Sequence, residues 1–385
     1  MDIAEGHVAL EQGDLGQAAA KFRHALELQP ESADAEHFLG AVLEKRGDAE
    51  GASRAYRRTL ELNPGDILAR EKIAALSSER GAADESTRIS QFEDYIREGR
   101  FQDVEPLLAA YVKEHPESSW GWYALGYSQF AQRKIGESIQ ALARSLQLDV
   151  RNAEAHKILG RDLMVVGKFD AAQTEFEQGI RYSPQSAEMH LNLGKLFSIQ
   201  DSWVAARKEF EQALRIDPLY MEAWDALGFA QEALGDGAGA VASYEKAIAL
   251  NEAKKGRFAS AHVNLSGYYN RKGDYEKARE YALAALQIDP ECDGAWFQKA
   301  KTDEAQGRLN DAAEALAQAV SLNPRASSYY YVLANVYRQL GKTEDRGKAL
   351  DAFMRLQKET NEIEEKRRAL AGLSAPPPRP KSQPD

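Results

Sequence analysis

Residues 187–218 read AEMHLNLGKLFSIQDSWVAARKEFEQALRIDP, and this stretch decides the fold. Large apolar and small residues recur in it three or four positions apart, which is the spacing of one helix face. A closing proline cannot continue a helix, so it marks a stop. The stretch therefore predicts two amphipathic helices joined by a short turn. Its informative positions are His190, Leu193, Gly194, Phe197, Ala206, Phe210, Ala213 and Pro218.

The same pattern returns along the chain with a period of 34 residues. Pro184 and Pro218 are separated by 34 residues, and so are Pro290 and Pro324. Fixed self-similarity at this period indicates a solenoid, in which each repeat packs only on its neighbours. The prolines that align in this way are Pro30, Pro64, Pro116, Pro184, Pro218, Pro290 and Pro324.

Alignment on the prolines shows a motif of the form W-x2-L-G-x2-Y…A-x3-F…P. It appears as Trp224, Leu227 and Gly228 followed by Tyr244, and it starts again at Trp122. The sequence therefore resembles the tetratricopeptide-repeat family. The resemblance implies an all-α, right-handed superhelical solenoid of about ten tetratricopeptide helix-turn-helix repeats with a C-terminal capping helix. The expected repeats are 1–32, 33–66, 85–118, 119–152, 153–186, 187–220, 221–254, 259–292, 293–326 and 327–360.

Two interruptions divide the predicted array. Residues 1–79 form an N-terminal module of two repeats plus an unpaired helix, residues 80–86 a linker, and residues 87–372 the main array and capping helix. Residues 373–385 are rich in proline and are expected to be a disordered tail that follows a complete array. Four extra residues at 255–258 match about one helical turn, so the preceding helix is expected to run longer.

Composition excludes several classes of function. The net charge is −11 and the pI is about 5.4, the opposite of the basic footprint of a nucleic-acid binder. No apolar run is long enough for membrane insertion. Cys292 is the only cysteine, so no intramolecular disulfide forms. The N-terminus lacks a signal peptide, which predicts a cytoplasmic protein, or a periplasmic one if a leader has been removed.

No catalytic, cofactor-binding or metal-binding residues are expected, and the chain is not predicted to be an enzyme. His156, His190 and His262 occupy the position that holds tryptophan in other repeats. One histidine per repeat does not place its ligands within one coordination sphere. The glycine-rich stretch 235–239 lacks the preceding strand and the lysine of a phosphate loop, and it coincides with an inter-helix turn.

A partner is expected on the first helix of each repeat. We call the tryptophan-type position the slot. Residues one, five and eight positions after it form an adjacent stripe, because successive residues rotate by about 100°. The family resemblance implies that this stripe lines a concave groove. Aromatic residues and nearby cations in it predict binding of a peptide with apolar side chains and an acidic motif. The candidate residues are Trp120, Tyr123, Tyr127, Phe130, Lys157, Arg161, Asn192 and Lys195.

Some members of the family hold chaperone tails in a dicarboxylate clamp. Lys157 and Asn192 match two positions of that clamp, but Glu222 and Ala226 stand where two further cations are required. The sequence thus argues against chaperone-tail binding. A second candidate surface contains Phe297, Lys301, Tyr331, Asn335 and Arg338.

The predicted function is a scaffold or adaptor that binds a peptide segment of another protein. The alternative is a regulatory or substrate-presenting arm of a transferase or other enzyme complex. The oligomeric state and the identity of the partner stay open.

Overall fold

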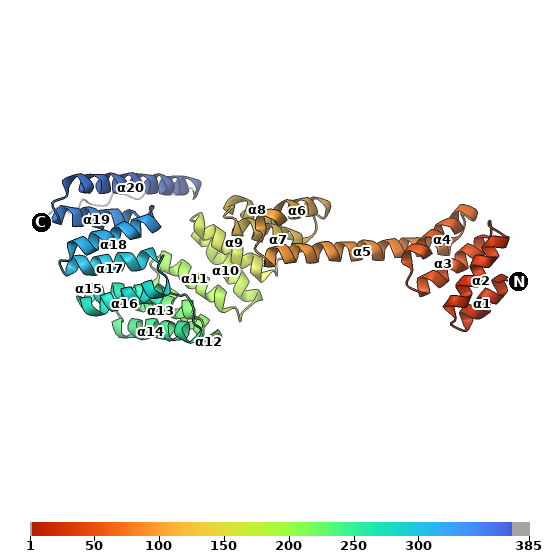
Figure 1. The fold of residues 1–385 in the computed structure, drawn as a ribbon, viewed down its shortest axis with the longest axis horizontal. Helices are drawn as coiled ribbons and strands as arrows, with labels where there is room; N and C mark the ends of the chain where they lie inside the picture. Colours follow the sequence, from red (N-terminus) through yellow and green to blue (C-terminus); the bar gives the residue numbers. More distant parts are fainter. Residues whose placement is uncertain (1, 372–385) are drawn as a thin grey trace. The chain divides into compact units, whose positions relative to one another are not determined.

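A computed structural model describes residues 2–371, without the side chains of residues 78–84, 364 and 366–371. The described chain is helical, and consecutive helices pack as antiparallel pairs (Figure 1). It divides into two units, Met1–Val104 and Glu105–Asp385, each described here by itself. The predicted tail at 373–385 lies outside the described residues.

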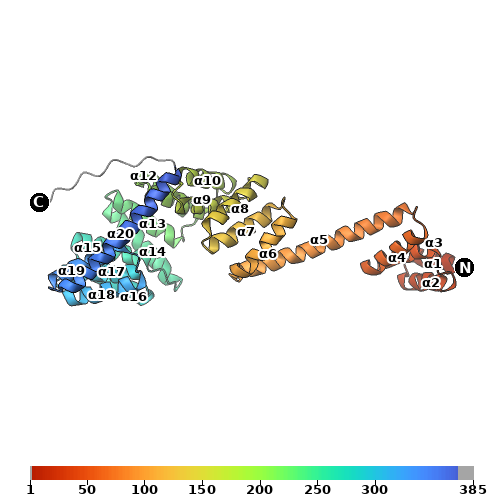
Figure 2. The ribbon, with the colours of Figure 1, turned by 90° about the horizontal axis from the view of Figure 1, so that it is seen from above.

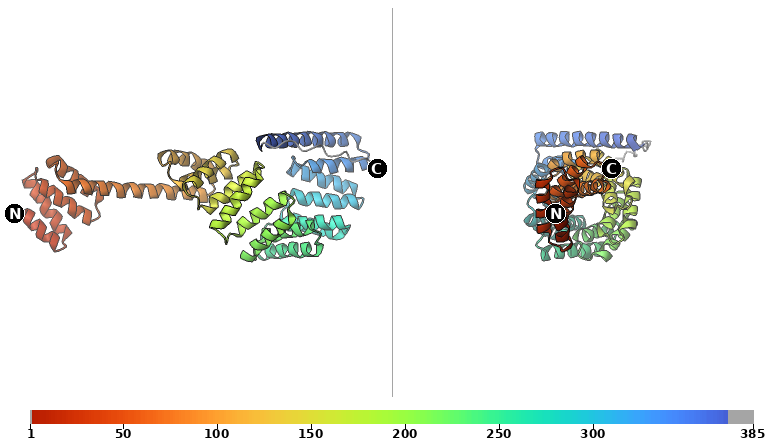
Figure 3. Two further views of the ribbon diagram at one scale, coloured as in Figure 1. Left: turned by 180° about the vertical axis from the view of Figure 1, so that it is seen from behind. Right: turned by 90° about the vertical axis from the view of Figure 1, so that its right-hand side faces the viewer.

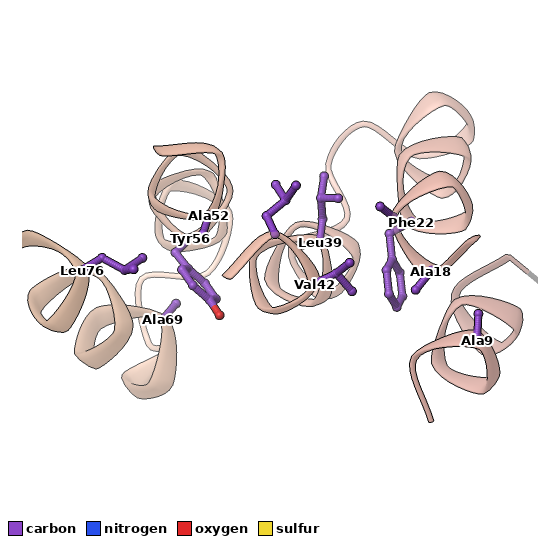
Figure 4. Close-up of a cluster of buried hydrophobic side chains, with 11 residues drawn as sticks. Ala9, Ala18, Phe22, Leu39, Val42, Ala52, Tyr56, Ala69 and Leu76 are labelled. Atoms are coloured by element: carbon purple, nitrogen blue, oxygen red, sulfur yellow. The ribbon is translucent and has the colours of Figure 1, made fainter. Parts of the chain in front are cut away.

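Unit 1 holds two complete helix pairs and a long fifth helix. One core joins them: Phe22 and Tyr56 are fully buried between α-helices and pack with Leu39, Val42 and Leu76 (Figure 4). The helices are α1 (Asp2–Glu11), α2 (Leu15–Leu28), α3 (Ala33–Lys45), α4 (Ala49–Leu62) and α5 (Ile67–Arg97).

The predicted helix at 67–79 and linker at 80–86 are one continuous helix, α5 (Figure 2). Alanine and glutamate in this stretch are strong helix formers, and one glycine costs only about 1 kcal/mol. Two 34-residue steps from Gly13 and Gly47, which end first helices with positive φ, lead to Gly81, but the chain continues in helix there. The expectation of a non-helical linker is therefore wrong.

Unit 2 continues the series after α6 (Phe101–Glu114), which begins at the end of unit 1. Its helix pairs wind into a superhelical solenoid (Figure 3). The helices are α7 (Ser119–Ala131), α8 (Ile135–Leu148), α9 (Ala153–Val165), α10 (Phe169–Tyr182), α11 (Ala187–Ile199), α12 (Trp203–Ile216), α13 (Met221–Ala233), α14 (Gly237–Ala253), α15 (Ser260–Lys272), α16 (Tyr275–Ile288), α17 (Asp293–Ala305), α18 (Leu309–Leu322), α19 (Ser327–Gln339) and α20 (Thr343–Ala371).

Two predicted irregularities are confirmed. α14 has 17 residues, whereas α12 has 14, so the residues before 255–258 do extend the helix. α20 spans 29 residues and continues beyond the last repeat, as expected of the capping helix.

The slot residue ties each first helix to the loop before it. The indole Nε1 of Trp224 donates to the Pro218 carbonyl at 2.9 Å. His156 places Nε2 2.9 Å from the Val150 carbonyl, so histidine replaces tryptophan in this role. The histidines in the slot thus have a structural function. The same bond to the carbonyl six residues earlier is made by Arg70, Trp122, Trp296 and Tyr330.

The turn inside each pair requires a left-handed residue. Gly47, Gly167 and Gly235 have φ between 77° and 84° there, as predicted for glycines that end the first helix. Gly273, Gly307 and Gly341 adopt the same conformation. Two pairs do not use glycine: Arg133 has φ 60° and Asp201 has φ 56°.

Replacing Arg133 with glycine should stabilise unit 2. A non-glycine residue pays about 1 kcal/mol for the left-handed region, part of which glycine loses again to chain entropy in the unfolded state. We expect Arg133→Gly to raise the free energy of unfolding by about 0.5 kcal/mol in urea denaturation. Gly136→Ala, in the adjacent α8, is the control for a local glycine change. A loss of stability in Arg133→Gly would contradict this account.

Asp162 is a carboxylic acid in the core of unit 2. Its side chain is fully buried, and neither carboxylate oxygen has a hydrogen-bond partner among the described residues. Burial raises its pKa to about 6, although the nearby Ser138 hydroxyl and the Arg161 charge act in the opposite direction. Asp303 is equally buried but contacts Arg279, Lys299 and Arg308.

The Asp162 pKa predicts a pH-dependent stability. The folded chain keeps this proton up to about pH 6, whereas the unfolded chain releases it near the model value of 3.8. Its contribution therefore falls as pH rises through this window, and above it the ionised group costs about 3 kcal/mol. Asp162→Asn should match wild type at pH 4 and exceed it by about 2 kcal/mol at pH 8 in urea denaturation.

Asp303→Asn is the matched control, because it removes a buried carboxylate that has three cationic partners. It should lose stability at pH 8, since those cations would remain without their counter-ion. If Asp162→Asn were also less stable than wild type at pH 8, the assignment of an uncompensated acid would be wrong.

Candidate peptide-binding surface

The candidate residues lie on three first helices that follow one another in unit 2. α7 contacts α9, and α9 contacts α11, so their stripes are adjacent. Each helix starts at the same place in its repeat, because the side chains of Ser118, Asn152 and Ser186 each accept a hydrogen bond from the backbone N–H three residues on. This common register aligns the stripe positions from one repeat to the next.

The aromatic end of the stripe is half-buried. Tyr123 and Tyr127 stack with ring centroids 6.3 Å apart, and both pack with Phe130 against the core around Leu142 and Leu159. Burial, with the nearby Glu154 charge adding to it, raises the pKa of Tyr123 to about 12. Trp120 is also half-buried, in an edge-to-face contact with Tyr111. These aromatics serve the core and leave only part of their surface to a ligand.

Lys157 is not a free cation. Its side chain is 11% exposed, and Nζ lies 2.7 Å from Glu154 Oε2 and 2.6 Å from Glu188 Oε2. The carboxylates outweigh the effect of burial and raise its pKa. The expectation that Lys157 is available to an acidic ligand is therefore not met in this structure.

Arg161 occupies a middle state. Its guanidinium carbon lies 4.8 Å from the centre of the Phe130 ring, a cation–π contact. Nη1 is 3.9 Å from Glu188 Oε1, and the side chain is 43% exposed. The contact joins the aromatic end of the stripe to its cationic part.

Lys195 and Asn192 are the two donors without an acceptor. Lys195 is exposed and has no carboxylate within ion-pair distance in the part of the chain that the structure describes. Loss of hydration, reinforced by the Arg161 charge, lowers its pKa. The Asn192 side chain is 9% exposed, and its Nδ2 has no hydrogen-bond partner among the described residues. A buried amide N–H without an acceptor costs about 1–3 kcal/mol, so an added acceptor would be favourable there.

Three glutamates escaped the prediction. Glu154, Glu188 and Glu222 recur every 34 residues, two positions before the slot. That spacing was visible in the sequence, but reading only the stripe left these positions out. Glu188 faces the cations Lys157 and Arg161, and the charge of Glu222 acts on Lys195. Phe229, on α13, was also missed and is 49% exposed.

The second predicted surface is on α17 and α19. Lys301 Nζ lies 5.7 Å from the centre of the Phe297 ring, and Phe297 stacks on Tyr329 at 4.6 Å. Loss of hydration, with the Arg271 charge, lowers the pKa of Lys301. Tyr331 is 50% exposed. This surface resembles the first in chemistry, but among the described residues it has no orphaned amide comparable to Asn192.

Models of two tetratricopeptide-repeat families match most of the chain. One matches residues 3–67, 89–153, 159–220 and 220–291, and the other residues 269–336. The chain belongs to the tetratricopeptide-repeat family. The residues that neither model covers between 67 and 89 coincide with the continuous part of α5.

Other tetratricopeptide-repeat proteins resemble the chain over different lengths. The cell division cycle protein 27 homolog of Caenorhabditis elegans is 33% identical over 79 residues, which are 20% of this chain and 10% of that protein. The Cut9–Hcn1 hetero-tetramer structure of the APC/C matches with a TM-score of 0.55 and 15% identity, over 83% of this chain and 59% of that one. Yeast Tom70 matches with a TM-score of 0.53 and 14% identity, over 95% and 87%. These structures share the fold.

The tetratricopeptide-repeat array makes this chain a protein-interaction scaffold. Within the described residues, no helix is both long and apolar enough to cross a membrane. The same residues contain no group of three or more His, Cys, Asp or Glu side chains placed to hold a metal ion.

The contrast between Lys195 and Lys157 predicts different amine reactivity. An amine reacts only when neutral; the pKa of Lys195 is lowered, and that of Lys157 is raised. With one unit between two pKa values, the neutral fractions differ tenfold. We expect acetic anhydride at limiting dose and pH 7.5 to label Lys195 at least about ten times faster than Lys157, as read by peptide mass spectrometry. Equal labelling would contradict the described environments.

Proposed function

We propose that the surface formed by α7, α9 and α11 binds an acidic segment of a partner protein. The observation that carries the proposal is the pair of unsatisfied donors on α11, the Asn192 amide and the Lys195 ammonium group. An incoming carboxylate would supply the acceptor that Asn192 lacks and the counter-ion that Lys195 lacks. Hydrogen bonds to charged groups are stronger than those between neutral groups, so this pairing favours a carboxylate over a neutral acceptor.

The aromatic end of the stripe supports an apolar component in the same ligand. Tyr123, Tyr127 and Phe130 are half-buried and ordered by the core, so binding to them requires little loss of side-chain freedom. Aromatic residues and arginine are frequent anchors in protein interfaces, and Arg161 already stacks on Phe130. A segment with carboxylates and one or two large apolar side chains fits this arrangement.

The ion pairs of Lys157 narrow the expected ligand contacts. With Glu154 and Glu188 bound to it, Lys157 adds little positive charge for a partner. The proposal therefore moves the electrostatic centre of the site from Lys157 to Arg161, Asn192 and Lys195.

Charge reversal at Lys195 tests the proposal. The probe is a fluorescein-labelled glutamate-rich peptide with two leucines, and binding is followed by fluorescence polarisation at low salt. Lys195→Glu replaces attraction with repulsion, so we expect affinity to fall at least about fivefold. Higher salt should weaken wild-type binding, since partly exposed charges are screened.

Two controls make the result specific. Lys208→Glu changes the charge equally at an exposed lysine on the second helix α12 and should bind like wild type. A matched lysine-rich peptide should bind at least about fivefold more weakly to wild type. Equal binding by Lys195→Glu and Lys208→Glu would show that the acidic peptide does not use this surface.

A further inference from the structure

Glu188 bridges two cations of the candidate surface. It belongs to the first turn of α11, and its two oxygens face different residues of α9. Oε2 lies 2.6 Å from Lys157 Nζ, and Oε1 lies 3.9 Å from Arg161 Nη1. The chain thus places its own carboxylate where the sequence predicts the carboxylate of a ligand.

The bridge is not required to neutralise Lys157. Glu154 is 2.7 Å from the same ammonium group and comes from the same helix. Removing the charge of Glu188 would leave Lys157 paired, whereas Arg161 would lose its nearby carboxylate. The Glu188 side chain is 43% exposed, so solvent and a ligand can reach it. The first turn of a helix favours a carboxylate, but the contacts to α9 lie on the side of the stripe.

We propose that Glu188 is an internal competitor for acidic partners: it occupies Lys157 and Arg161 and so sets how much negative charge a segment must bring to bind. This inference rests on the function proposed above. A segment with one carboxylate reaches only Asn192 and Lys195. A multiply acidic segment can, in addition, displace Glu188 from Arg161, whose exposed guanidinium then accepts a ligand carboxylate in place of the internal one.

The competition has a defined direction. For most salt bridges, removing one partner weakens a complex, but here removing Glu188 frees a cation and removes a like charge from the path of the ligand. Glu188→Gln should therefore tighten binding of acidic segments. Partly exposed ion pairs contribute roughly 0.2–1 kcal/mol, which corresponds to a gain of up to about fivefold.

The test compares Glu188→Gln with Glu137→Gln in the full chain. Glu137 is exposed on the second helix α8, and its replacement changes the net charge equally. The probe is the labelled glutamate-rich peptide, used beside a version with a single glutamate. We expect Glu188→Gln to bind the multiply acidic peptide about three- to fivefold more tightly than Glu137→Gln. Circular dichroism establishes that both variants keep the helical fold.

Three outcomes separate the two proposals. Tighter binding by Glu188→Gln alone supports the internal competitor. If wild type binds the acidic peptide and Lys195→Glu does not, but Glu188→Gln binds equally or more weakly than Glu137→Gln, the proposed function holds and the competitor role is wrong. If neither wild type nor Glu188→Gln binds the acidic peptide, both proposals are overturned.

Discussion

The structure depends on how closely the second helix of each pair approaches the first. A large side chain of the second helix lies against a glycine of the first, and a Cβ atom on Gly160 would be 2.6 Å from Phe176. Gly40 with Tyr56 and Gly228 with Tyr244 are packed in the same way. This contact fixes the rotation of the first helix. It therefore decides which residues enter the core and which form the stripe that a partner can reach.

The repeat geometry was predictable because each of its causes is local. The slot, the glycine and the closing proline recur at fixed spacing, so the helices of unit 2 follow from the sequence. The path of residues 80–86 did not follow, because Gly81 keeps the turn position of the pattern but lies inside α5. A pattern read one repeat at a time gives the place of a turn, and the surrounding sequence decides whether the chain turns there.

The candidate site was predictable in its positions but not in its charge state. Position along the helix placed Lys157, Arg161 and Lys195 on one stripe, as the structure does. Their difference arises from Glu188, which reaches Lys157 from the next repeat at 2.6 Å. Such a contact crosses 31 residues of sequence and depends on side-chain conformation. The orphaned Asn192 amide likewise becomes visible only when its neighbours are in place.

The central claim is that an acidic segment completes the hydrogen bonding of Asn192. The most direct test follows the Asn192 side-chain amide by ¹⁵N NMR, with its signal assigned through its loss in Asn192→Asp. Titration with the glutamate-rich peptide should shift this signal, while the lysine-rich peptide should leave it in place. If the glutamate-rich peptide binds and the Asn192 signal does not move, the segment binds elsewhere and the account of this surface is wrong.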